Sequence, residues 1–453
     1  TMPPPPRRRS PGAPVSHAAT SRHSSTSSGR STIASLFYLL AFAAAPALAF
    51  SPATVAPPMT TSVAPRSVLR PSPSRSDRRS LRLRLRDAPP VASQDPPSFR
   101  AELSKLESEG VPLLGCDADQ VHTFCAALWS TMSQLSYDDA ARRACLILER
   151  IPIEALHAFA NDFGMMKGQA RLTKELNELN RLTVGVVGKG AGPALLIESA
   201  ERTEDEKSAR IPLLTVESHL HEDRCLAAVK SFVDRLVVGA DLCPYTRNSE
   251  IAAVGLEARG VRPAPVAYRY SGSGDACAAA SEFWNCVCEL LSVPEDEIST
   301  TILSLPAVGY GTDERAHGRF AAVMEMISRN LCLFRGDGVF GLVHFHPAYD
   351  RDGIVPKTKP AYGHLPPRSW LRPMMRRNGN AEADTLTEEE LALSDYQRRA
   401  PHTAINVLRA SQLNAATGGQ SVVDLVLEDG TTEKASGITT YSRNAVRLAG
   451  AGR

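Results

Sequence analysis

The sequence predicts an α/β fold: a small parallel or mixed sheet flanked by helices, with an N-terminal helical module and a C-terminal β-hairpin. Three observations support this prediction. Apolar, strand-like runs alternate with helical patterns between residues 265 and 347, which is typical of parallel strands joined by right-handed crossovers. Residues 117–182 show three-and-four apolar spacing, which indicates helices. Asp429-Gly430 separates two alternating segments near the end and indicates a hairpin turn.

The first 100 residues differ in charge from the rest of the chain. They contain 14 Arg, no Lys and three acidic residues, which leaves 37 basic and 46 acidic residues for 101–453 and a formal net charge of −9 there. Nucleic-acid binding needs clustered Lys and Arg, and the acidic balance of residues 101–453 disfavours it. We therefore expect no nucleic-acid partner.

The start of the chain predicts a signal peptide over residues 1–49. Basic residues precede an apolar core at residues 36–45, and Ala47-Leu48-Ala49 forms a cleavage site of the A-x-A type. The apolar core is too short for a membrane span. We therefore expect no integral span in the mature chain.

Residues 50–96 predict a transit-peptide-like, disordered leader. Residues 50–86 carry eight Arg and one acidic residue among many Ser and Pro. Together with Phe50 directly after the cleavage site, this tandem resembles the bipartite presequence of algae with secondary plastids. The nine cysteines are odd in number and form no C-x-x-C pair, which favours a reduced compartment such as a plastid stroma. Ordinary secretion remains the alternative.

Residues 97–182 predict the helical module. "DADQVHTFCAALWSTMSQL" begins with Asp caps and has helical spacing, and "SYDDAARRACLILERIPIEALHAFANDFG" predicts two more helices broken at Pro152. The module has no catalytic cluster, so docking of a protein partner is one role open to it. Residues 183–214 predict strands joined by a Gly-rich turn. The turn matches no nucleotide-binding loop, because Lys189 precedes Gly190 and Pro193 stands where a dinucleotide fingerprint needs Gly.

Residues 215–416 predict the α/β core, and residues 417–453 the hairpin and tail. The core begins with an amphipathic helix, "CLAAVKSFVDRLVVG", ending at Gly239. Near-continuous apolar strands agree with a sheet covered on both faces. Residues 395–416 predict a loop entering a helix. The intervening elements expected in order are a strand (265–270), a helix capped by Asp275 (275–291), a strand (300–306), a helix (319–334) and a strand (338–347).

The last of these strands ends in an unusual cluster, "GLVHFHPAYDRDG". Ligands of parallel sheets gather outside the carboxyl ends of the strands, so His346 and Tyr349 are expected at a site. His344 and His346 share one face, because strand side chains repeat every two residues.

Four ordered blocks resemble the Domain of Unknown Function 1415 family over residues 215–415. The blocks are "VKSFVDRLVVGADLCPYT", "TTILSLP", "VFGLVHFHPAYDRDG" and "RRAPHTAINVLR". The chain departs from the family pattern at Ala400, where the family has Ser, and at Asn406, where it has His. The family has no established reaction. The resemblance places its motif residues at Cys243, Pro244, His346, Pro347, Tyr349, Arg399, Pro401 and Arg409.

These residues suggest an enzyme or binding protein for a small anionic ligand. Cys243 with His346 would be a nucleophile–base pair, since a thiolate at neutral pH needs a nearby imidazole or positive field. Arg399 and Arg409, with Tyr349, would bind the ligand, because a guanidinium grips a carboxylate or phosphate through two hydrogen bonds.

Two alternatives stay open. His344 and His346 have good spacing for metal ligands, and Asp350, Asp352, His364 or His402 would complete a site in a hydrolase-like protein. The second alternative is a non-catalytic plastid interaction or assembly protein. The sequence names no cofactor, reaction, substrate or oligomeric state.

Overall fold

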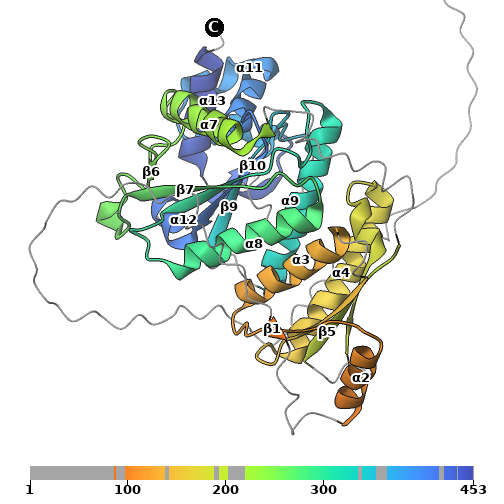
Figure 1. The fold of residues 1–453 in the computed structure, drawn as a ribbon. Coiled ribbons are helices and arrows are strands. Elements are labelled where there is room, and N and C mark those ends of the chain that lie inside the picture. Colours follow the sequence, from red (N-terminus) through yellow and green to blue (C-terminus); the bar gives the residue numbers. More distant parts are fainter. Residues whose placement is uncertain are drawn as a thin grey trace, which may run out of the picture. The chain divides into compact units, whose positions relative to one another are not determined.

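The structure is a computed structural model. It describes residues 86–87, 97–137, 142–187, 193–201, 220–334, 339–353, 365–417, 423–435 and 437–451. The expected signal peptide lies outside the described residues, as does the transit-like leader apart from β1 (Arg86–Asp87). The described residues form two five-stranded sheets and a two-stranded hairpin, with helices around them (Figure 1). The α/β class predicted from the sequence is confirmed.

The first sheet takes β2 and β3 from the region predicted as a helical module, whereas β4 and β5 lie where strands joined by a turn were predicted, and that part of the prediction is confirmed. Its strand order is β1-β2-β3-β5-β4, with β2 and β3 parallel and the other pairs antiparallel. The helix expected before Pro152 is wrong, because β3 occupies its place. Four of the five residues of β3 are buried, and a strand buried on both faces shows no alternation that would distinguish it from a helix. The elements are α2 (Pro97–Ser108), β2 (Leu113–Gly115), α3 (Val121–Tyr137), β3 (Arg143–Ile147), α4 (Ile153–Thr173), η2 (Asn177–Arg181), β4 (Leu182–Val186) and β5 (Ala194–Ser199).

The second sheet has the order β6-β7-β8-β10-β9. Its strands are β6 (Ile251–Ala252), β7 (Ala264–Tyr270), β8 (Thr300–Ser304), β9 (Phe340–Phe345) and β10 (Ala404–Arg409). Strands β7 and β8 pair in parallel, as predicted, whereas β10 lies between β8 and β9 and is antiparallel to both. The sheet is therefore mixed. Residues 395–416 were predicted as a loop entering a helix; the structure places the strand β10 between them, and the helix α12 (Ala410–Thr417) begins only after this strand.

Helices cover both faces of the second sheet (Figure 1). On one face, α8 (Ala276–Ser292) and α9 (Glu314–Phe334) pack through Phe283, Trp284 and Phe320 onto Phe340 and Ile405. Asp275 caps α8 as predicted, since its carboxylate accepts a hydrogen bond from Ala278 N at 3.0 Å. On the other face lies α7 (Glu222–Phe232), which continues into a single π-helical turn, η4 (Val233–Val238).

The first sheet's helices share a core with α8 and α9. Helix α3 lies beside α8 (Figure 1), and Trp129 of α3 donates a hydrogen bond to Asn330 of α9 at 2.8 Å. In α4, Asp162 accepts a charge-assisted bond from Arg329 at 2.6 Å. Both contacts are largely buried, so these elements form one continuous apolar interior.

The C-terminal part, residues 423–451, contains a β-hairpin followed by a helix. Strands β11 (Val423–Val426) and β12 (Thr432–Ala435) pair around Asp429-Gly430, as predicted, and Gly430 takes a φ of 80° that favours glycine. The tail then forms α13 (Ile438–Ala451), which packs on α10 (Leu371–Arg377). Among the described residues, no helix is both long and apolar enough to cross a membrane. The remaining elements are η5 (Glu257–Arg259), η7 (Arg368–Trp370), η8 (Ala381–Asp384), α11 (Glu388–Ala392) and η9 (Leu393–Arg398).

Candidate functional site

The two histidines of β9 face away from Cys243. The rings of His344 and His346 are fully buried and lie 5.4 and 5.5 Å from the ring of Phe320 on α9. Phe345, between them, points to the opposite face, where it packs against Phe232 and lines the same cavity as Cys243. The sheet thus separates the thiol from both imidazoles.

His346 uses both ring nitrogens to bind backbone groups. Nδ1 accepts a hydrogen bond from Ala348 N at 3.0 Å, which leaves Nε2 to donate to the Gly309 carbonyl at 2.8 Å. Burial lowers the pKa of His346, so the neutral ring is favoured. The structure therefore does not bring His346 to Cys243 as a base, and it gives the imidazole a role in fixing the turn after β9.

Tyr349, Arg399 and Arg409 also bind backbone groups. The Tyr349 hydroxyl accepts from Leu365 N at 2.9 Å, and burial raises the pKa of this phenol to about 12. Arg399 Nε donates to the Tyr349 carbonyl at 2.9 Å. Arg409 donates to the carbonyls of Leu290 and Val293 at the end of α8. Arg409 ends β10 whereas Arg399 precedes it, so the structure does not gather these residues around one ligand.

The metal alternative finds no support among the described residues. In that part of the chain no group of three or more His, Cys, Asp or Glu side chains has a metal-binding arrangement. Asp350 and Asp352 instead interact with Arg368. His364 lies outside the described residues.

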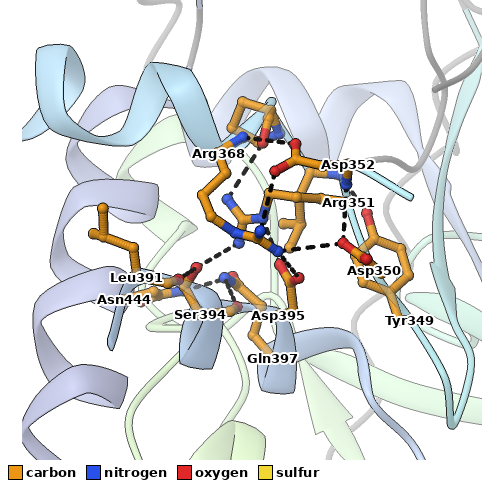
Figure 2. Close-up of polar contacts among 12 residues, drawn as sticks. Tyr349, Asp350, Arg351, Asp352, Arg368, Leu391, Ser394, Asp395, Gln397 and Asn444 are labelled. Atoms are coloured by element: carbon orange, nitrogen blue, oxygen red, sulfur yellow. Dashed lines mark hydrogen bonds and ion pairs between the residues drawn. The ribbon is translucent and has the colours of Figure 1, made fainter. Parts of the chain in front are cut away.

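A buried ion-pair network lies beside the end of β9, and we call it the paired arginine cluster: Arg351, Arg368 and Asp395 (Figure 2). Asp395 and Arg351 are fully buried and form an ion pair. Arg368 donates to the second carboxylate oxygen of Asp395 at 2.9 Å, and Arg351 also donates to Ser394 Oγ at 2.7 Å. Every charge in this cluster is met by an opposite charge within the protein.

A cavity of about 550 Å³ lies on the α7 side of the second sheet. Its volume is in the range of small-molecule sites. Directly paired strand residues, such as Asn406 with Val343 and Ile302, form its floor. Most of its wall is apolar, and the principal apolar side chains are Val233, Val237, Ile302, Val343, Phe345 and Leu408.

The π-helical turn leads directly to Cys243 on the cavity wall. Val233 and Val237 of η4 line the cavity, and the carbonyl of Val237 accepts from Leu242 N at 2.8 Å. Cys243 follows and is half-buried. Thr246 donates its hydroxyl hydrogen to Cys243 Sγ at 3.2 Å. Single π-turns within helices are frequent at functional sites.

Two arginines near Cys243 have no carboxylate partner among the described residues. Arg398 is only 8% exposed, and its guanidinium lies 5.4 Å from the centroid of the Phe345 ring. Its Nη1 is buried without a hydrogen-bond partner. Arg443 of α13 reaches only the Leu242 carbonyl, at 3.4 Å. We call Cys243, Arg398 and Arg443 the open arginine end of the cavity.

The amide of Asn444 joins the three segments that supply the open arginine end. Its Nδ2 donates to the Leu242 carbonyl at 3.0 Å and to Gln397 Oε1 at 3.1 Å. Leu242 precedes Cys243, Gln397 precedes Arg398, and Asn444 follows Arg443. These hydrogen bonds join the segments that carry Cys243, Arg398 and Arg443, of which the first and the last lie 200 residues apart in sequence.

The charge of the cavity opposes that of the chain around it. The described residues that line it include Arg259, Arg398 and Arg443 and no Asp or Glu, although residues 101–453 carry a net charge of −9. A low-dielectric pocket with fixed positive charge favours an anion. Of the residues predicted from the sequence, Cys243 lines the cavity, whereas Arg399 does not and its neighbour Arg398 does. Arg443 was not predicted, because no motif gave a signal for it.

Residues 224–375 match the family model described as "Protein of unknown function (DUF1415)". The resemblance inferred from the sequence blocks is thus confirmed for this segment, which contains Cys243, His346 and Tyr349. The match ends before Arg399 and Arg409, so their assignment to the family pattern stays a prediction. No curated protein and no solved structure matches the chain.

Proposed function

We propose that this protein, whose residues 224–375 match a family of unknown function, binds a small anionic ligand in the cavity of the second sheet. Arg398 and Arg443 would hold the anionic group, beside the Cys243 thiol. One observation carries the proposal: Arg398 is 92% buried at a cavity whose described lining contains no acidic residue.

The physical reason is the cost of a buried charge. A cation removed from water is unfavourable unless an anion or several hydrogen bonds compensate it. Arg351 and Arg368 obtain this compensation from Asp395, whereas among the described residues the guanidinium of Arg398 meets the face of Phe345 and no carboxylate. A carboxylate or phosphate accepts two parallel hydrogen bonds from a guanidinium, and the apolar wall suits the rest of an organic molecule.

Catalysis at this site would depend on Cys243, because His346 lies on the other face of the sheet. The proposal therefore keeps the thiol and the anionic ligand of the sequence prediction and replaces His346 and Arg399 by Arg398 and Arg443. Plastid localisation also stays a proposal. It rests on the composition of residues 1–86.

The test is a binding screen on the full chain with carboxylates, phosphates and sulfonates, followed by calorimetry on the best anion. We expect anions to raise the melting temperature and their neutral amides or esters to leave it unchanged. Arg398→Gln should weaken binding about tenfold or more, since a charge-assisted contact is lost.

Arg447→Gln is the control, because Arg447 lies on α13, as Arg443 does, but is exposed and pairs with Asp241. It should leave the affinity unchanged. The proposal is wrong if no anion binds, or if Arg398→Gln and Arg447→Gln affect binding equally.

A further inference from the structure

Cys243 is the one cysteine among the residues lining the cavity. Of the nine cysteines, all of which lie in described parts of the chain, seven are buried and only Cys243 and Cys332 are half-buried. Cys332 lies on α9 and is absent from the cavity lining. Cys243 is thus the thiol that a molecule entering the cavity would meet.

Two polar groups lie at Cys243. A thiol reacts with disulfides through its sulfur, and Thr246 donates a hydrogen bond to this Sγ at 3.2 Å. Arg443 binds the carbonyl of Leu242, the residue directly before Cys243, so a cation lies beside the backbone of the thiol.

A second observation at the same end points to a ligand. Arg398 is nine-tenths buried and lacks a carboxylate partner within the described part of the chain. Asn444 Oδ1 is also buried there without a hydrogen-bond partner. The unmet donor of Arg398 describes a place for the acceptor oxygens of an anionic molecule in the cavity that Cys243 also lines.

We propose that Cys243 forms a mixed disulfide with small carboxylate-bearing disulfides, and that Arg398 and Arg443 select these reagents by charge. The inference rests on the proposed function, because it uses the same anion site. It adds the chemical class of the ligand and the bond that is formed.

The reaction balances without a further reagent. The Cys243 proton passes to water or buffer, and the thiolate attacks one sulfur of the incoming disulfide. A bond forms between Sγ and that sulfur while the original S–S bond breaks, and the other half leaves as a thiolate with the electron pair. The Cys243 sulfur is oxidised and the leaving half is reduced. Since the lining holds no second cysteine, the adduct persists until an external thiol removes it.

The experiment compares three disulfides of matched size on the full chain at neutral pH: dithiodiglycolate (anionic), bis(2-hydroxyethyl) disulfide (neutral) and cystamine (cationic). Peptide mass spectrometry measures the initial rates at Cys243 and Cys332. Dividing the first rate by the second removes the intrinsic reactivity of each reagent.

We expect this ratio to be about tenfold higher for dithiodiglycolate than for the neutral reagent, and lowest for cystamine. Added salt should reduce the preference. In Arg398→Gln with Arg443→Gln the three ratios should converge, whereas Arg447→Gln should keep them apart. The inference is overturned if Cys243 is unreactive, or if its ratio to Cys332 is the same for all three reagents in the unmutated chain.

Adipate separates this inference from the proposed function, because it has the length of dithiodiglycolate with CH₂–CH₂ in place of S–S. Calorimetric binding of adipate, together with equal rate ratios for the three disulfides, would refute the mixed disulfide alone. If neither adipate nor any other anion binds and the ratios are equal, both proposals fail. If both hold, adipate should slow the reaction at Cys243 and not at Cys332.

Discussion

The paired arginine cluster and the open arginine end lie at either end of one short segment, since Asp395 and Arg398 are three residues apart. In the first, Asp395 meets two guanidinium groups and the ion pair with Arg351 is fully buried (Figure 2). In the second, Arg398 and Arg443 border a cavity without a carboxylate from the described residues. The positive charge of arginine is thus neutralised by a carboxylate of the protein in the first place, and in the second it is available to an anionic ligand.

This difference separates a structural arginine from a binding arginine. A structural arginine has its anion on the chain, so its loss should affect folding first. A binding arginine lacks one, so its loss should affect affinity first. Two of the following experiments test this separation, and the pH experiment measures the cost of a buried charge at a histidine for comparison.

The largest effect is expected for Asp395→Asn. It leaves Arg351 buried without a counter-charge, and removing one partner of a buried pair costs roughly 3–5 kcal/mol. Denaturant unfolding measures this free energy. Asp384→Asn is the control, because its pair with Arg376 is solvent-exposed; it should change little. Equal losses of unfolding free energy in the two variants would show that the buried ion pair of Asp395 contributes no more to stability than an exposed one.

A smaller effect is expected from the buried imidazoles on the α9 face. Burial, followed by the neighbouring His346, lowers the pKa of His317 to about 4, against about 6.5 in the unfolded chain. Between these values the unfolded state binds more protons, so stability is complete above pH 6.5 and is lost as pH falls towards 4.

From pH 7 to pH 5 this amounts to about 2 kcal/mol for His317. The measurement is the unfolding free energy at both pH values in the parent chain and in His317→Leu. The parent should lose more stability by that amount. Identical losses would mean that His317 is protonated in the folded protein at pH 5.

The smallest effect is expected for Asn406→Asp, which places a carboxylate on the cavity floor without changing side-chain size. Thr300 Oγ1 lies within hydrogen-bond distance of both Asn406 Oδ1 and the Val407 carbonyl, so its one hydrogen can be donated to a carboxylate at position 406. The new charge repels an anionic ligand, and we expect affinity to fall about tenfold with the melting temperature nearly unchanged. Calorimetry with the best anion of the screen decides this. Unchanged affinity would place the anion elsewhere.

The sequence predicted those elements whose local signals agree with their tertiary setting. Helix α8 has an N-terminal cap at Asp275 and an apolar stripe, and both persist in the structure. Strand β10 lies in the segment predicted as a loop entering a helix, where Ile405, Leu408 and Leu413 are apolar. Ile405 and Leu408 lie on a strand instead, since β8 and β9 on either side satisfy its backbone.

The site was predicted in part, for a similar reason. Two-residue periodicity correctly placed His344 and His346 on one face, but one sequence cannot reveal which face a helix covers. Helix α9 covers theirs. Likewise, two adjacent arginines at the end of η9 have different surroundings. Arg398 lines the cavity, whereas Arg399 donates to the Tyr349 carbonyl, and the sequence alone does not distinguish them.

The hydrogen bonds of Asn444 have a consequence for the order in which the cavity can form. Its walls come from segments between Val233 and Asn444. The strands and α7 can associate before α13 packs, but the open arginine end is complete only when Asn444 has bonded Leu242 and Gln397. A ligand of this end can therefore act only on a chain whose last wall is already in place.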